Sequence, residues 1–245
     1  MTDTLLIALA LVPALVVAIV FHEVAHGWTA LMLGDPTAKE RRRLSLNPIR
    51  HVDLFGTLIL PGLLAISGAP VFGWAKPVPV NKWRLDNPRY GMMAVAAAGP
   101  GTNLVLAALG AVVLGLLLRG MTGGQIEAGT FLGLFELVSQ SAFGLASYAL
   151  VALYFFIVIN IFLALFNLLP IPPFDGSHIV EGLLPREAAQ VYNKLRPFGF
   201  PLLFLLLLVI PWLFPQLGII ERVVLPPVEW VQERYLRLAM WVAGG

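Results

Sequence analysis

Residues 4–33 read TLLIALALVPALVVAIVFHEVAHGWTALML, an apolar segment interrupted by one polar insertion, His22-Glu23-Val24-Ala25-His26. This run is longer than the roughly 20 residues that a helix needs to cross a bilayer. Ionisable side chains are costly in hydrocarbon, so those found inside a membrane helix are functional by default. The segment therefore predicts a membrane helix that carries a reactive site near its inner end.

The composition of the whole chain agrees with a membrane protein. Of its 245 residues, 58% are hydrophobic and only 12% are charged, whereas soluble domains carry about 25% charged residues. Further uncharged runs cover Gly91–Leu118, Leu137–Leu169 and Phe198–Ile220, the last of them interrupted by prolines. We therefore expect an all-α integral membrane protein with about four transmembrane helices.

The connection between the first two runs has a different pattern. Leu54–Ile66 is apolar but short, and Val71–Val80 (VFGWAKPVPV) combines valines, prolines and aromatic residues. Two short extended segments joined by a Gly/Pro turn fit this pattern, so we expect a membrane-associated β-hairpin here. A structured connecting loop is the alternative.

The basic residues predict the orientation in the membrane. If the first helix runs inward, twelve of the 16 Lys and Arg residues lie in the inner connections. The outer four are Arg119, Arg222, Arg234 and Arg237. The positive-inside rule then places the N-terminus outside and the active site toward the cytoplasmic side of the cell membrane. The Arg41–Arg43 run is interpreted as a topology determinant, and a net charge of +2 gives no reason to expect nucleic acid.

Two parts of the chain are distinguished. Residues 1–185 hold the motifs and form the expected core. Residues 186–245 are expected to add a C-terminal membrane helix and an amphipathic tail over Pro226–Met240, which alternates charged and apolar residues and suits a membrane surface.

The polar insertion in the first helix is an HExxH motif. Because His22 and His26 are four residues apart on a helix, they share one face and can bind one metal ion. Glu23 stands beside the first ligand, where it can act as a general base on water that zinc activates at neutral pH. The chain has no cysteine, so any metal must be held by His, Asp or Glu.

A third protein ligand is expected from the stretch NLLPIPPFDG, residues 167–176. Its Asp175 follows the inner end of the third run, on the same side of the membrane as the HExxH motif. Non-helical backbone at membrane depth is tolerated where it faces protein or a wet cavity. Asp175 would complete a His₂Asp set with one open position, typical of one catalytic zinc per chain. An Asp-Gly pair beside prolines also suits a simple turn.

Three other polar residues have two interpretations each. Asn103 either contacts the substrate backbone or forms interhelical hydrogen bonds, and Asn167 either orients the Asp175 loop or also joins helices. His178 is a candidate donor to the oxyanion or a satisfied loop histidine. His51, between Arg50 and Asp53, is expected at the surface.

Three motifs occur in a family-specific order: HEVAHGWTA (22–30), AAAGPGTN (96–103) and NLLPIPPFDGSHIV (167–180). Over residues 15–185 the chain resembles the site-2 proteases, in the short bacterial and archaeal branch without a PDZ or CBS domain. The resemblance implies that His22, His26 and Asp175 bind zinc and that Glu23 is the catalytic acid/base. It also implies intramembrane cleavage of single-span membrane proteins, such as tethered regulators, or of leftover signal peptides.

The resemblance further implies a substrate-binding role for the connecting segment. A substrate helix must unwind before its backbone is accessible, and an exposed strand edge can capture it by strand addition. Phe72, Gly73 and Trp74 are the candidate contacts, and Pro77 and Pro79 limit pairing because they lack N–H donors. The second motif departs from the family pattern at Gly101, where a bulkier residue is more usual.

Two other classes of function are open at this point. A metal transporter would use His and Asp as a transit site, although such proteins usually show paired broken helices, and one chain of motifs is present here. A catalytically silent membrane chaperone would bind substrates without needing Glu23.

Overall fold

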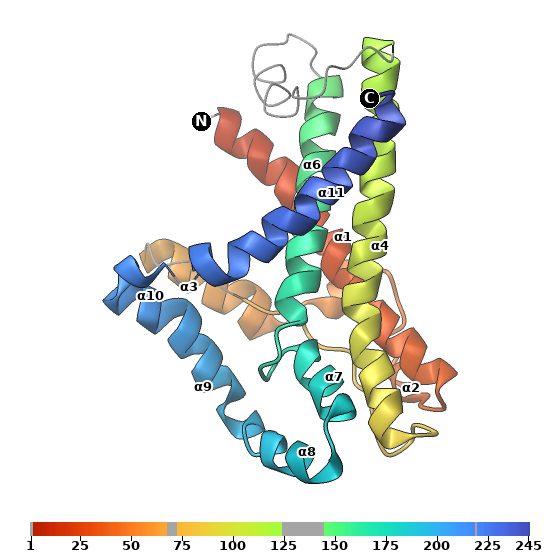
Figure 1. The fold of residues 1–245 in the computed structure, drawn as a ribbon, viewed down its shortest axis with the longest axis vertical. Helices are drawn as coiled ribbons and strands as arrows, with labels where there is room; N and C mark the ends of the chain where they lie inside the picture. The colour runs from red at the N-terminus through yellow and green to blue at the C-terminus, as the bar shows by residue number, and fades with distance from the viewer. Residues whose placement is uncertain (1, 68–72, 124–144, 219) are drawn as a thin grey trace. The chain divides into compact units, whose positions relative to one another are not determined.

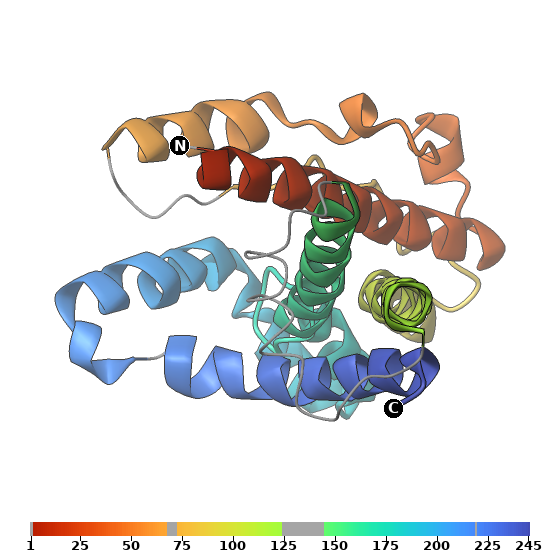
Figure 2. The same ribbon diagram turned by 90° about the horizontal axis from the view of Figure 1, so that it is seen from above.

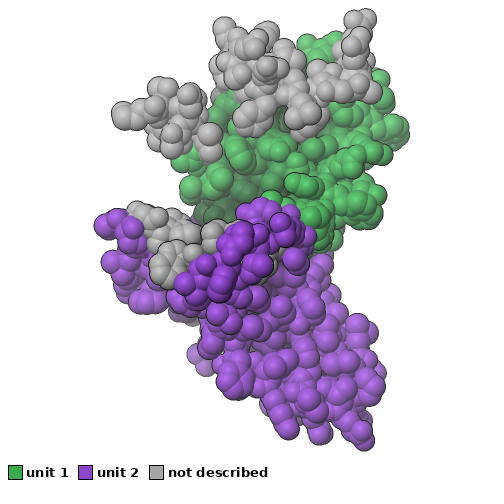
Figure 3. Space-filling model, turned by 60° about the vertical axis from the view of Figure 1, so that its left-hand side comes forward, with its two compact units in different colours: residues 1–18, 103–165, 225–245 green, residues 19–102, 166–224 purple. Residues whose placement is uncertain are grey.

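The computed structural model describes residues 2–67, 73–123, 145–218 and 220–245, and every regular element in these ranges is a helix (Figure 1). The all-α class is thereby confirmed. The chain forms two compact units (Figure 3). The first contains residues 1–18, 103–165 and 225–245, and the second contains residues 19–102 and 166–224.

Three helices of the described chain are long and apolar enough to cross a membrane: α1 (Thr2–Met32), α4 (Pro88–Thr122) and α6 (Leu145–Asn167). Each exceeds the roughly 20 residues of a span and has few charged side chains. They establish a multi-pass membrane protein. Residues 137–144 of the third expected run lie outside the described residues.

The fourth expected span does not form one long helix. Its residues divide into α9 (Gly199–Phe204), the π-helix η4 (Leu205–Val209), α10 (Ile210–Leu213) and the 3-10 helix η5 (Pro215–Leu217). Together α9, η4 and α10 are shorter than a perpendicular span needs. The first three elements follow one another without a break, and the helix ends where Phe214 leaves the helical conformation, directly before Pro215.

The expected β-hairpin between α1 and α4 is wrong for the described residues. Leu54–Ile59 form a π-helix (η2) that continues into α3 (Leu60–Ser67), and Gly73–Val80 have no regular secondary structure. Asp53 caps η2 by accepting hydrogen bonds from the backbone N–H groups of Phe55 and Gly56 at 3.1 and 2.7 Å. An apolar segment satisfies its own backbone groups as a helix, whereas the prolines of 73–80 leave a ladder incomplete.

In the first unit, α4, α6 and α11 (Leu225–Ala243) pack around one apolar core. In Figure 1, α11 crosses the other two helices obliquely, and Figure 2 shows the same helices from above. A Cβ added to Gly115 of α4 would lie 2.3 Å from the carbonyl oxygen of Ala239, so glycine allows this close approach. The buried core residues are Ala107, Ala111, Leu114, Leu118, Leu150, Ile157, Ile161, Val228, Ala239 and Ala243.

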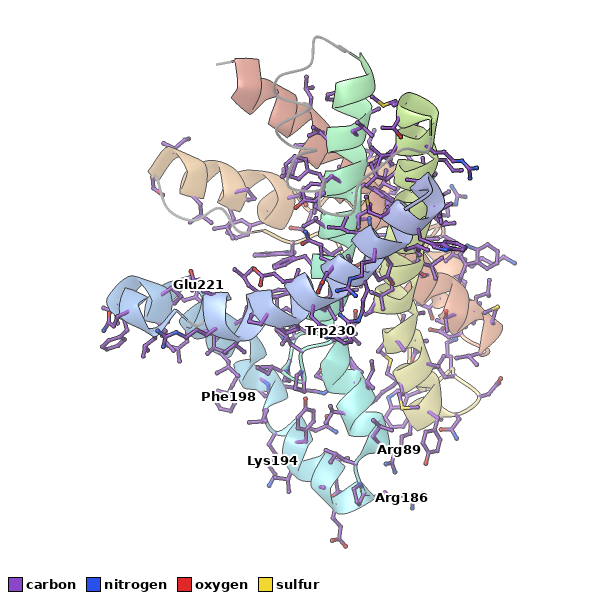
Figure 4. The ribbon with its side chains drawn as sticks, turned by 45° about the horizontal axis from the view of Figure 1, so that its top comes forward. Arg89, Arg186, Lys194, Phe198, Glu221 and Trp230 are labelled. Atoms are coloured by element: carbon purple, nitrogen blue, oxygen red, sulfur yellow. The ribbon has the colours of Figure 1, made fainter. Side chains whose placement is uncertain are left out.

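The second unit holds the end of α1, the start of α4, and α7 (Asp175–Leu183) and α8 (Arg186–Asn193). Arg89, labelled in Figure 4, joins α4 to α7 by donating to the backbone carbonyls of Gly182 and Leu184. The shorter elements are α2 (Thr37–Glu40), η1 (Pro48–His51), η3 (Arg196–Phe198) and η6 (Ile220–Val224). The two hydrogen bonds of Arg89 hold α4 and α7 together in the unit that contains the HExxH motif.

Candidate metal centre

Three side chains that the sequence singled out converge in the second unit. His22 Nε2 lies 3.0 Å from His26 Nε2 and 3.1 Å from Asp175 Oδ2, and His26 Nε2 lies 3.3 Å from the same Asp175 oxygen. The two imidazoles are nearly buried, and the carboxylate is about four-fifths buried, with a side-chain exposure of 20%. They are the one group of three or more His, Cys, Asp and Glu side chains in the described residues that could hold a metal ion.

The local sequence explains why Asp175 reaches the histidines. The α6 helix ends at Asn167, and Asp175 is the first residue of α7 after the proline-rich turn. A Cβ on Gly176 would lie 2.2 Å from the Leu168 carbonyl oxygen, so glycine lets the start of α7 fold back against the end of α6. Burial raises the pKa of Asp175, but hydrogen bonds from both histidines outweigh it and hold that pKa below its usual range. The carboxylate is therefore ionised at neutral pH.

The first turns of α4 orient the second histidine. His26 Nδ1 lies 2.7 Å from the Val95 carbonyl oxygen, so Nδ1 carries a proton and donates it, and Nε2 is the ring nitrogen that faces Asp175. Gly99, one turn further along α4, lies so close that an added Cβ would be 2.6 Å from both imidazole rings. The α4 helix therefore contacts both imidazole rings, through the Val95 carbonyl and the backbone at Gly99.

The donor set fits zinc. Tetrahedral zinc with bonds of about 2.0–2.1 Å holds its ligand atoms about 3.3–3.4 Å apart. The three separations in the structure, 3.0, 3.1 and 3.3 Å, are close to that value. Two imidazoles with a carboxylate, and no thiolate, form the kind of set found in catalytic zinc sites.

Glu23 has a defined backbone partner. Its Oε2 accepts a hydrogen bond of 2.6 Å from the N–H of Val78, in the segment between α3 and α4. Pro77 and Pro79 flank Val78, so this is the single N–H group of the three residues. This bond was not predicted, and its one signal in the sequence is the Pro-Val-Pro triplet, which leaves a single N–H group.

Two other expected site residues are asparagines of the apolar helices α4 and α6. Asn103 is fully buried in the first unit, where its Nδ2 donates to the Ala18 carbonyl at 3.1 Å and to Asn160 Oδ1 at 2.8 Å. Both bonds match the interhelical interpretation of Asn103. Asn160, which was not among the predicted site residues, in turn donates to the Phe156 carbonyl. Asn167 is the last residue of α6.

The candidate substrate contacts are only partly described. Phe72 lies outside the described residues. Gly73 and Trp74 are described, and the Trp74 ring packs against Phe55 and Phe200 with centroid distances of 6.0 Å. The Trp74 N–H donates to the Gly56 carbonyl at 3.0 Å.

His178 lies one turn after Asp175 on α7 and accepts a hydrogen bond at Nδ1 from Arg196 at 2.9 Å. The proton of the neutral ring is therefore on Nε2. Burial, followed by the charge of Arg196, lowers the pKa of His178 to about 4, against smaller opposing effects of Glu181 and Asp175. His178 is thus a neutral donor at physiological pH.

This pKa predicts acid sensitivity. The unfolded chain takes up a proton at His178 near pH 6.5, whereas the folded protein does so only near pH 4. The stability contributed by the neutral ring is present above pH 6.5 and is lost as the pH falls to 4, by at most about 3 kcal/mol. Thermal unfolding in detergent from pH 7 to 4 should show a steeper decline for wild type than for His178→Gln. Parallel curves for the two proteins would contradict the assignment.

Comparison with known proteins agrees with this geometry. The pattern of Peptidase family M50 matches residues 10–210. A Bacillus subtilis protein named "Putative zinc metalloprotease YwhC" is 39% identical over 207 residues, which cover 82% of this chain and 80% of that protein. "Putative zinc metalloprotease Rip2" of Mycobacterium tuberculosis is 29% identical over 217 residues, covering 84% of this chain and 73% of that protein. No solved structure matches the chain significantly. The chain therefore belongs to peptidase family M50, the site-2 proteases, and is a zinc metalloprotease.

Proposed function

We propose that this chain is an intramembrane endopeptidase, which cleaves peptide bonds in or near the transmembrane segments of single-span membrane proteins or signal-peptide remnants. One observation carries the proposal: His22 and His26 lie inside the apolar span Ala8–Met32 of α1. A protease whose metal ligands lie on a membrane-crossing helix acts on bonds at membrane depth. The distribution of Lys and Arg supports a site toward the cytoplasmic side of the cell membrane.

Each residue of the centre has a proposed role. His22, His26 and Asp175 would hold zinc, which when bound polarises the scissile carbonyl and makes water a nucleophile at neutral pH. Glu23 takes the proton from the attacking water and passes it to the leaving amine. His178, with its proton on Nε2, is the candidate donor to the negative charge that develops on the carbonyl oxygen.

The segment 73–78 is the proposed place where the unwound substrate binds. The N–H groups of Trp74, Lys76 and Val78 are bonded to Gly56, His51 and Glu23, so alternate residues face one side, as in an extended chain. Gly73 and Ala75 then face the other side, and in the described part of the chain no hydrogen bond involves the Ala75 backbone. A substrate strand has these two N–H groups to pair with.

The proposal is tested with purified protein, a single-span substrate and a water-soluble peptide that carries the same cleavage sequence. We expect cleavage of the spanning substrate to stop when a chelator removes the metal and to return when zinc is added. Mass spectrometry should place the new termini within the membrane segment. Cleavage confined to the soluble flanks, or preference for the soluble peptide, would show a membrane-anchored protease of ordinary substrates instead.

A further inference from the structure

Residues 76–78, which we call the strap, are held at three points in the second unit. The Lys76 N–H donates to the His51 carbonyl at 2.9 Å, and the Lys76 carbonyl accepts from Arg43 Nη2 at 2.6 Å. Two residues later, the Val78 N–H donates to Glu23 Oε2. The bonds at Lys76 thus lie directly beside the bond that orients the carboxylate of Glu23.

Arg43 differs from the two arginines before it. Arg41 and Arg42 are exposed, as a topology determinant would be, whereas only 8% of the Arg43 surface is exposed. Burial of a guanidinium is costly unless it is hydrogen-bonded. Within the described residues, the guanidinium donates through Nη2 to the Lys76 carbonyl, and its Nε has no partner. The buried guanidinium of Arg43 donates to a single backbone carbonyl, that of Lys76. We take this as a sign that Arg43 serves to fix the position of the Lys76 backbone.

His51 contributes to the same anchor and is not the surface residue that the sequence suggested. It is 3% exposed, and its Nε2 lies 2.7 Å from the Ser45 carbonyl oxygen, so the ring is buried in the 43–51 loop. Its own carbonyl receives the Lys76 N–H. The backbone N–H and the backbone carbonyl of Lys76 are therefore both held by residues of the 43–51 segment.

We propose that Arg43 is a positioning residue for catalysis: it anchors the strap so that the Val78 N–H holds the Glu23 carboxylate in its working orientation. The inference rests on the proposed role of Glu23 as the general base. A glutamate side chain has three rotatable bonds, and in the described residues Oε2 has this one hydrogen bond while Oε1 has none. If the strap shifts, Glu23 is still present but loses its contact with the Val78 N–H. Its carboxylate can then rotate away from the attacking water.

The test compares Arg43→Ala with Arg41→Ala, which removes the same charge from the same loop at an exposed position. We expect Arg43→Ala to lower kcat by about tenfold to a hundredfold, with KM and zinc content unchanged, because a misplaced catalytic group costs rate and not affinity. Arg43→Lys, which keeps one donor, should recover part of the rate. Arg41→Ala should behave as wild type.

A double-mutant cycle separates positioning from general loosening. Val78→Pro removes the N–H that contacts Glu23, and if Arg43 acts through that bond, the losses in kcat of Arg43→Ala and Val78→Pro are not additive. Additive losses, an equal loss in Arg41→Ala, or loss of zinc from Arg43→Ala and Arg43→Lys would overturn the inference. Wild-type kcat in Arg43→Ala, with Glu23→Gln inactive, would overturn it alone and leave the proposed function standing. Cleavage by Glu23→Gln would instead overturn the proposed function.

Discussion

Glu23→Gln is expected to bind zinc as wild type does and to lose cleavage of a membrane-spanning substrate by about a thousandfold, within the 10²–10⁴ range of general acid–base catalysis. Glutamine keeps the size of the side chain, and its Oε1 can accept the Val78 N–H that now contacts the carboxylate at 2.6 Å. It cannot take a proton from water. The substitution therefore removes the chemistry and leaves the geometry of the metal ligands.

The measurement pairs zinc content with the initial rate of cleavage in detergent. Glu187→Gln is the matched control, because Glu187 is an exposed residue of α8 in the same unit. It should have the wild-type rate and zinc content. Undiminished cleavage by Glu23→Gln would contradict the role of Glu23, and loss of zinc from this variant would show that Glu23 supports the metal ligands instead. Metal transit or substrate holding without cleavage would survive the substitution, so the same assay separates these alternatives.

Gly99→Ala is expected to displace both imidazoles and to lower zinc affinity and activity by at least about tenfold to a hundredfold, the cost of disturbing the partners of metal ligands. The added Cβ would lie 2.6 Å from His22 Cε1, His22 Nε2 and His26 Cε1. The rings have little freedom to move away, because His26 is held by the Val95 carbonyl and His22 lies 3.1 Å from Asp175. One methyl group is therefore enough to disturb the centre.

Gly101→Ala, two residues along the same helix, is the control for the substitution itself. No heavy atom lies within 4 Å of a Cβ placed there, so the methyl group of alanine meets no neighbour at this position. Alanine in place of a helical glycine should stabilise the protein by about 0.5–1 kcal/mol and leave zinc content unchanged. Zinc titration and thermal unfolding of the two variants decide the question, and a Gly99→Ala protein with wild-type affinity would refute the close contact.

The connecting segment and the fourth apolar run show where pattern alone misleads. Leu54–Ile66 is too short to span, and it forms the helices η2 and α3 instead of part of the expected hairpin, because an apolar segment satisfies its backbone groups internally as a helix. The run after Phe198 is apolar enough for a span, but its helix ends at Leu213, because Phe214 leaves the helical conformation before Pro215. Both errors concern which local structure an apolar run adopts, which composition does not decide.

The sequence by itself determined the all-α membrane class and the reactive pair His22 and His26 with Glu23 beside them, because apolar length and a four-residue helical spacing are local properties. Asp175 was a candidate on its motif and expected side of the membrane, and its approach to the histidines depends on how α7 meets α1. Only the tertiary structure decided that Gly99 supports the imidazoles and that Arg43 holds the strap, since these contacts join residues far apart in the chain. Spacing along a sequence carries no information on such contacts, because packing between separate elements creates them.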